Sequence, residues 1–134
     1  MCMILKFNNI CISLSDKQLD PSKPGSDMAG QAAAALASGA ILFNSHDPAY
    51  AKLLFRHARE LADFASNFQG KYSDSIPEVQ DFYRSWSGYN DEIVLAEAWL
   101  GLAAAVVEPE NAESYKNRAI QKAAQFPIGS VMGF

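Results

Sequence analysis

The sequence is poor in cysteine and has no concentration of basic residues. Its two cysteines, Cys2 and Cys11, both lie in the first eleven residues, which argues against a disulfide scaffold or a cysteine-ligated metal site in the rest of the chain. Lysine and arginine total 11 against 15 for aspartate and glutamate, so the net charge is −4. Because no basic cluster is present, we expect no binding to nucleic acid.

Long apolar runs are also missing. The opening MCMILKFNNICISL is interrupted by Lys6, Asn8 and Asn9 and is too short to span a bilayer. It lacks a clear basic flank and a small-residue cleavage site, so it gives no clear signal peptide; a buried or frayed strand-like segment is favoured over a degenerate signal. We therefore expect no membrane insertion. Sequence motifs such as G-x-G-x-x-G, the P-loop, H-E-x-x-H and C-x-x-C do not occur.

What the 134 residues do contain is typical of one globular, helical domain. Hydrophobic residues make up 49% and charged residues 19%, and no useful strand-like alternation follows residue 20. Pro24 and Gly25 interrupt any earlier structure, and Ser26 or Asp27 is placed to cap an alanine-rich helix over 28–43. Two glycines inside that helix, Gly30 and Gly39, are unfavourable there by themselves and indicate close packing against neighbouring helices.

A second helix is predicted from Asp47, as its N-cap, and Pro48, at its first position. Apolar residues then recur every three or four positions as far as Phe68, and Gly70 is placed to end the helix. The lysines and arginines of this helix, and those of the last helix over 108–126, are expected on solvated faces.

A long connection, residues 71–90, follows the second helix, and a short helical turn is expected in it after Pro77. A third helix, 91–107, is apolar on most faces and is expected to be buried. The fold class is all-α, built from antiparallel helix pairs. Four helices are too few to cover such an apolar third helix, so the chain is expected to form part of a larger helical array.

The stretch FYRSWSGYNDEI, residues 82–93, has two acidic residues that allow two readings. Asp91 and Glu92 begin the third helix, where carboxylates are favoured by free N–H groups and by the helix dipole. Alternatively, backbone oxygens of Ser87 and Gly88 would join these two carboxylates in an oxygen-rich site for Ca²⁺. Their spacing does not match an EF-hand loop. Chemistry alone leaves both readings open.

The aromatic residues of the same stretch are equally ambiguous. Phe82, Tyr83, Trp86 and Tyr89 could fill a core, and for Phe82 that is the preferred interpretation. Tyrosine and tryptophan on a loop, however, combine a flat apolar face with a polar edge. Since a pyranose ring has an apolar face and a rim of hydroxyls, Tyr83 and Trp86 are also candidates for sugar binding.

Three blocks in order resemble glycoside hydrolase family 9, the cellulases: PGSDMAGQAAAALASGAILF, DPAYAKLLFRHARELADFASNFQGKYSDSIP and FYRSWSGYNDEIVLAEAWL. The resemblance covers about 24–100 and implies an (α/α)6 barrel. It also implies a structural calcium site, with backbone oxygens from Ser87 and Gly88 and carboxylates from Asp91 and Glu92. A further carboxylate, normally supplied by a later helix, is not found here.

The resemblance further implies that Tyr83 and Trp86 line a cellulose-binding cleft. The family hydrolyses β-1,4-glucosidic bonds with inversion, using a general base and a general acid. The base belongs to an Asp-Ala-Gly-Asp block and the acid is a glutamate near the end of the domain; neither block occurs here. No catalytic residue is therefore assigned, and this chain alone is expected to be inactive.

The expected organisation is a divergent or frayed segment over 1–23 and a partial barrel over 24–134, an internal portion of a cellulase. Secretion is implied only by the family. Two local departures are Gln31-Ala32, where the family usually has Glu-Thr, and Leu95, where an aromatic residue is common. Two other functions stay open: a non-catalytic glucan-binding remnant and a helical interaction module.

Overall fold

The computed structural model describes residues 18–126, so most of the segment expected over 1–23 and the last eight residues lie outside it. The described residues form helices and turns without a β-strand, which confirms the all-α prediction. The helices are α1 (Ser26–Phe43), α2 (Pro48–Asn67), α3 (Tyr72–Ser75), α4 (Gln80–Tyr83), α5 (Asn90–Val107) and α6 (Ala112–Gln125). Single 3-10 turns, η1 (Pro77–Val79) and η2 (Pro109–Asn111), precede α4 and α6.

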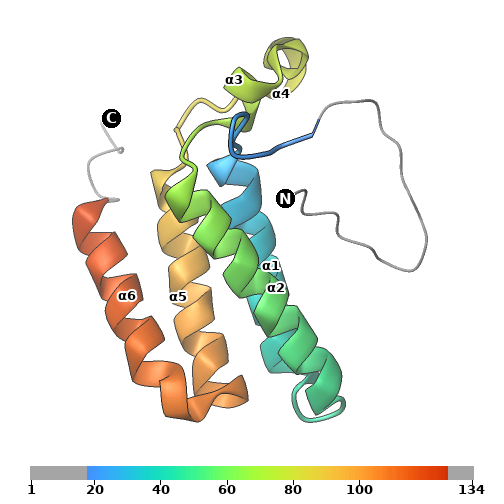
Figure 1. The fold of residues 1–134 in the computed structure, drawn as a ribbon, viewed down its shortest axis with the longest axis vertical. Coiled ribbons are helices and arrows are strands. Elements are labelled where there is room, and N and C mark those ends of the chain that lie inside the picture. Colours follow the sequence, from blue (N-terminus) through green and yellow to red (C-terminus); the bar gives the residue numbers. More distant parts are fainter. Residues whose placement is uncertain (1–17, 127–134) are drawn as a thin grey trace.

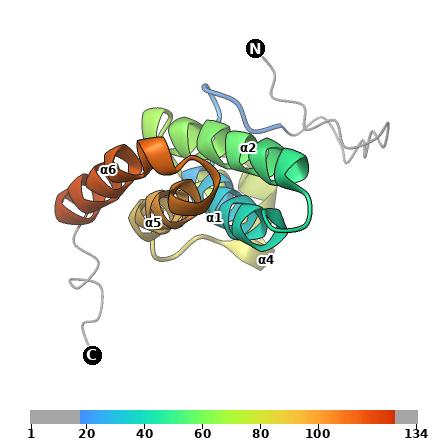
Figure 2. The same cartoon turned by 90° about the horizontal axis from the view of Figure 1, so that it is seen from below.

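The long helices form two antiparallel hairpins, α1 with α2 and α5 with α6 (Figure 1). α1 and α5 lie next to each other and run in the same direction, and α2 packs against both. Viewed from below, α2 and α6 flank the α1–α5 pair (Figure 2). The short helices α3 and α4 lie at the end of the bundle where α1 and α5 begin. Short turns after α1 and α5 account for this pairing, because they return the chain alongside the preceding helix.

The core between α1, α2 and α5 is built mainly from alanine. Small side chains allow helices to approach closely, and the larger buried residues Phe55, Ile93 and Leu100 fill the remaining space. The closest approach is at Gly30, where an added Cβ would lie 2.6 Å from the backbone oxygen of Glu92. At Gly39 the same atom would make an ordinary 3.4 Å contact with Leu54. The predicted close packing is therefore confirmed at Gly30, whereas the neighbouring helix is farther away at Gly39.

The beginning of α2 confirms its prediction, because the Asp47 carboxylate accepts a hydrogen bond from the Tyr50 N–H (3.0 Å) and Pro48 occupies the first turn. The beginning of α1 differs. Ser26 and Asp27 lie inside the helix, and Gly25 occupies the N-cap position. Capping by either side chain was the wrong expectation, because both side chains connect the helix to the segment after α2.

Those connections explain the position of Gly70. α2 ends at Asn67, before this glycine, so Gly70 does not form its C-cap. The Ser26 N–H donates to the Gly70 oxygen (2.7 Å), and the Gly70 N–H donates to the Ser26 hydroxyl (3.1 Å). An added Cβ on Gly70 would lie 2.5 Å from Pro24 Cγ. The glycine is thus required by a close approach of two chain segments.

One side of the α1–α5 pair is apolar and exposed. Leu95, Leu102 and Val106 recur along one face of α5 and are 42–57% exposed, so the expectation that this helix is buried holds for its other side only. Met28 and Leu42 form the corresponding stripe on α1 and are 49% and 69% exposed. This arrangement agrees with the prediction that the helices belong to a larger array.

The sequence predicted that the cations of α6 lie on a solvated face, and for Arg118 this was wrong. The Arg118 Nε–H donates to Glu97 Oε1 (2.9 Å), and a terminal N–H of the same guanidinium donates to Asp63. Glu97 is completely buried, so Arg118 supplies the positive charge that its carboxylate needs. The group ties α2, α5 and α6 together. Among the described residues, no helix is long and apolar enough to cross a membrane.

Candidate functional site

The connection between α3 and α5 is held at its base by Ser73, which is fully buried. The Gln80 amide donates to the Ser73 oxygen (2.9 Å), and the Ser85 N–H donates to the Ser73 hydroxyl (3.4 Å). The Ser85 hydroxyl in turn donates to the Gly88 oxygen (2.9 Å). The turn after Pro77 is present as η1 and α4, which confirms that prediction. These contacts fix both ends of the segment that carries the aromatic residues.

Within this segment the aromatic rings separate into exposed and packed groups. Trp86 is 84% exposed, Phe82 79% and Tyr83 75%. Placing Phe82 in the core was therefore wrong: its position on the short α4 turns it outward. Tyr89 is partly buried and packs against the small cluster that contains Ile93. The connection thus exposes the rings of Phe82, Tyr83 and Trp86 to solvent, and it packs against the helices through Tyr89.

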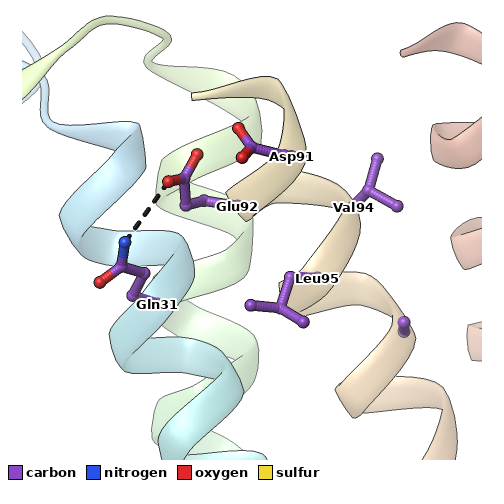
Figure 3. Close-up of a pocket in the computed structure, with 6 residues that line it drawn as sticks. Gln31, Asp91, Glu92, Val94 and Leu95 are labelled. Carbon is purple, nitrogen blue, oxygen red and sulfur yellow. Dashed lines mark hydrogen bonds between the residues drawn. The ribbon is translucent and has the colours of Figure 1, made fainter. Parts of the chain in front are cut away.

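The two acidic side chains lie on the first turn of α5, as the sequence predicted. Glu92 faces α1, where the Gln31 amide donates to its Oε1 (3.4 Å), and Asp91 lies beside it (Figure 3). The second oxygen of Glu92, Oε2, is buried without a hydrogen-bond partner. Burial, with the adjacent Asp91 carboxylate adding to it, raises the pKa of Glu92 to about 7. Glu92 therefore binds its proton more tightly than an ordinary glutamate does.

A cavity of about 430 Å³ adjoins these acids (Figure 3). Gln31 of α1 and Asp91 and Glu92 of α5 form its polar side, and Val94, Leu95 and Ala98 form its apolar side. Gln31 and Leu95 are two of the three positions where the sequence resemblance implies a departure from the cellulase pattern. These two side chains lie together on the surface shared by α1 and α5.

Ser87 and Gly88 lie just before Tyr89, the N-cap of α5, and Gly88 has a φ of +94°, a conformation that favours glycine. Over residues 18–126, no group of three or more His, Cys, Asp or Glu side chains is placed to hold a metal ion. A calcium ion here would consequently depend on backbone oxygens as well as on Asp91 and Glu92. The unpartnered Glu92 oxygen and the adjacent carboxylates suit such an ion, and the four-residue ligand set stays a prediction.

Two contacts at this site were not expected from the sequence. The Arg84 guanidinium carbon lies 5.0 Å from the centre of the Trp86 ring, and the Asp27 carboxylate accepts the Tyr72 N–H (3.0 Å). The neighbouring positions of Arg84 and Trp86 were a signal for the first contact. The second joins residues 45 positions apart, and the sequence carries no periodic signal for it.

Comparisons with known proteins identify the family of the chain. The family model described as Glycosyl hydrolase family 9 matches residues 15–131. The chain belongs to glycosyl hydrolase family 9. This confirms the resemblance drawn from the three sequence blocks.

Plant, bacterial and animal relatives all match. The chain is 52% identical over 83 residues to Endoglucanase 1 of Oryza sativa subsp. japonica, which covers 62% of the chain and 13% of the relative. It is 42% identical over 110 residues to Endoglucanase A of Bacillus pumilus, covering 82% and 16%. The solved endoglucanase of the termite Nasutitermes takasagoensis is 45% identical, with a TM-score of 0.73 over 83% of this chain and 24% of that one.

The chain therefore has the fold of a part of the family 9 (α/α)6 barrel, as predicted. It spans about an eighth to a sixth of the length of these curated relatives and about a quarter of the termite structure. The exposed apolar stripes of α1 and α5 have a direct explanation in this fold, because further helices pack beside such a pair in a complete barrel.

Proposed function

We propose that the chain is part of an endo-1,4-β-glucanase that cleaves internal bonds of cellulose-like glucans with inversion, and that it contributes binding rather than acid–base chemistry. Family membership and the endoglucanase relatives support the reaction class. The observation that carries the binding role is the outward presentation of Tyr83 and Trp86. Secretion follows from the family resemblance and belongs to the same proposal.

The aromatic rings at positions 82, 83 and 86 have little packing role within the described part of the chain. Trp86 and Tyr83 bury little surface within the chain, so they contribute little to its folding. Their flat faces suit the apolar face of a glucose ring, and the tyrosine hydroxyl and indole N–H suit the hydroxyl rim. A β-1,4-glucan presents such rings at regular intervals. The partner proposed for this surface is therefore cellulose or a cello-oligosaccharide.

The acid pair has a different role in this proposal. Asp91 and Glu92, with backbone oxygens of Ser87 and Gly88, would hold a Ca²⁺ ion that supplies positive charge and fixes the end of the aromatic connection to α5. In this proposal the two adjacent acids are metal ligands and not the catalytic acid and base. The general acid and base are assigned to none of these 134 residues, because neither sequence block that carries them occurs.

Calcium binding is tested by thermal unfolding of the 134-residue chain. The melting temperature should rise when Ca²⁺ is added, since a ligand that binds only the folded state stabilises it. Asp91→Ala should abolish this rise, and Glu113→Ala, at an exposed acid on α6, should leave it intact. An equal response to Ca²⁺ in Asp91→Ala would refute the ligand assignment.

Glucan binding is tested by titrating the chain with cellohexaose while tryptophan fluorescence is recorded. A saturable change is expected, and it should be lost in Trp86→Ala while the emission of Trp99, the second tryptophan, remains. No change up to millimolar sugar would contradict the proposal. Hydrolysis of carboxymethyl-cellulose by the purified chain would contradict the absence of the acid and base.

A helical interaction module is the second candidate, favoured by the exposed stripes of α1 and α5. Apolar surface of this kind marks interfaces between helices. If this function is correct, the chain should self-associate on size exclusion in a concentration-dependent way, and Leu102→Glu should abolish the association. Monomeric behaviour at high concentration, combined with sugar binding, would exclude it.

A further inference from the structure

The exposed aromatic surface contains one cation, Arg84, between Tyr83 and Trp86. Its guanidinium carbon lies 5.0 Å from the centre of the Trp86 ring, within the distance of a cation–π contact. Both side chains are exposed, so this contact orients the guanidinium without burying it. The aromatic surface is here defined as Phe82, Tyr83, Arg84 and Trp86.

The charge of Arg84 is not neutralised within the described part of the chain. No aspartate or glutamate there lies within ion-pair distance of it, although Asp81 and Glu78 belong to the same turn region. A guanidinium has five N–H donors in a planar fork that matches the two oxygens of a carboxylate. An arginine whose guanidinium lies over an indole at this distance can still direct these donors to a ligand. The position therefore offers a preformed carboxylate-binding edge beside the rings.

We propose that Arg84 is a specificity-determining residue, which adds recognition of a carboxylate to the aromatic surface. The corresponding ligand is a β-1,4-linked glucan that carries an occasional carboxylate, such as a glucuronic acid unit. This inference rests on the proposed glucan binding and narrows its substrate class. It requires no covalent step, only a charge-assisted hydrogen bond from Arg84 to the sugar carboxylate.

The surrounding charge selects this ligand over a densely charged polymer. The chain has a net charge of −4 and no basic cluster, so a polyanion would be repelled overall. A single cation over one exposed ring, with two further exposed rings in the same segment, matches one acidic sugar flanked by neutral ones. The rings supply stacking for the neutral units, and Arg84 supplies the partner for the acid.

The test compares two probes on the 134-residue chain: cellohexaose, and cellohexaose with one glucose replaced by glucuronic acid. At low ionic strength the acidic probe should bind about 5- to 10-fold more tightly, as one charge-assisted contact predicts. Arg84→Gln should reduce the ratio of the two affinities to about one, and added salt should reduce it in the wild type. Arg84→Lys should keep part of the preference, because lysine is a point charge without the planar fork.

The matched control is Arg56→Gln, at an exposed arginine on α2, which should retain the full preference. Equal wild-type affinity for both probes, or an unchanged preference in Arg84→Gln, would overturn the role of Arg84 while leaving glucan binding intact. Failure of both probes to bind would overturn the proposed function as well. A preference that Arg56→Gln also removes would show a general charge effect and contradict the proposal.

Discussion

The packed helices and the connection between α3 and α5 use large side chains in opposite ways. Between α1, α2 and α5, alanine dominates and the few large residues, among them Phe55 and Leu100, are buried. In the connection, Phe82, Tyr83 and Trp86 are each more than 70% exposed. The same chain thus places small residues where helices must approach closely and large flat ones where solvent or a ligand meets them.

The difference indicates which parts maintain the fold and which bind. Exposed rings that contribute little to folding need another reason to be present, and the hydrogen bonds around Ser73 show that their segment is nonetheless held in place. A rigid base with an exposed aromatic surface is the arrangement expected of a binding loop on a scaffold. Substitutions in the two regions should therefore separate stability from binding.

The largest effect on stability is expected from the charged group that joins α2, α5 and α6. Arg118→Ala leaves the Glu97 carboxylate buried without a cation, which should lower the free energy of unfolding by about 3 kcal/mol. The measurement is urea unfolding followed by circular dichroism. Lys116→Ala is the control on the same helix, because its pair with Glu113 is exposed and should contribute less than about 1 kcal/mol. Equal losses of unfolding free energy in both variants would contradict a special contribution of the ion pairs of Arg118 to stability.

A smaller loss is expected where α1 approaches α5. Gly30→Ala places a Cβ 2.6 Å from the Glu92 backbone oxygen, and the backbone shift this requires should cost about 1–3 kcal/mol. Gly39→Ala is the matched control, because its Cβ meets only Leu54 at 3.4 Å and the helix gains about 1 kcal/mol from alanine. Relative to wild type, the free energy of unfolding should decrease in Gly30→Ala and increase in Gly39→Ala. A stabilised Gly30→Ala would contradict the close approach.

Asp91 and Glu92 should make the stability of the metal-free chain depend on pH, with a smaller effect than the substitutions above. The pKa of Glu92 is about 7 in the folded state against 4.5 for an ordinary glutamate, so the folded chain holds this proton more tightly. The stabilisation is complete below pH 4.5 and is lost as the pH rises through 7. In EGTA, the melting temperature should therefore fall more between pH 4.5 and 8 in wild type than in Glu92→Gln. Glu113→Gln is the control, and it should fall as wild type does.

The smallest stability effect is expected in the connection. Trp86→Ala should change the free energy of unfolding by less than about 0.5 kcal/mol, because the ring is 84% exposed. The same substitution should weaken cellohexaose binding at least about tenfold, given the typical worth of a stacked aromatic ring. Urea unfolding and calorimetric titration measure the two quantities. A large loss of stability would mean that the indole is part of the core.

The helices could be predicted from the sequence because their signals are local. Asp47 and Pro48 begin α2 by a cap and a fixed φ, and the acids of the third predicted helix do lie in the first turn of α5. The family resemblance then added the barrel, which no local pattern shows. The residues assigned to calcium and sugar were candidates from their chemistry, which left other roles open; the resemblance favoured the binding roles, and they stay predictions.

Tertiary contacts explain the failures. Ser26 and Asp27 looked like caps because capping is local, yet they bind the segment after α2, more than 40 residues away. Arg118 looked solvated because helical periodicity does not reveal a buried acid on a neighbouring helix. Phe82 lies on a four-residue helix, too short for periodicity to indicate which way its side chain points.

The central claim is that the aromatic surface binds glucan while the helices hold it in place. The most direct test is to follow the two indole N–H signals and the backbone amides by NMR while cellohexaose is added. The indole signal of Trp86 and the amides of 82–89 should shift in a saturable way, and the indole signal of Trp99 should not. Shifts centred on Trp99 and the α1–α5 face, with Trp86 unchanged, would contradict the account.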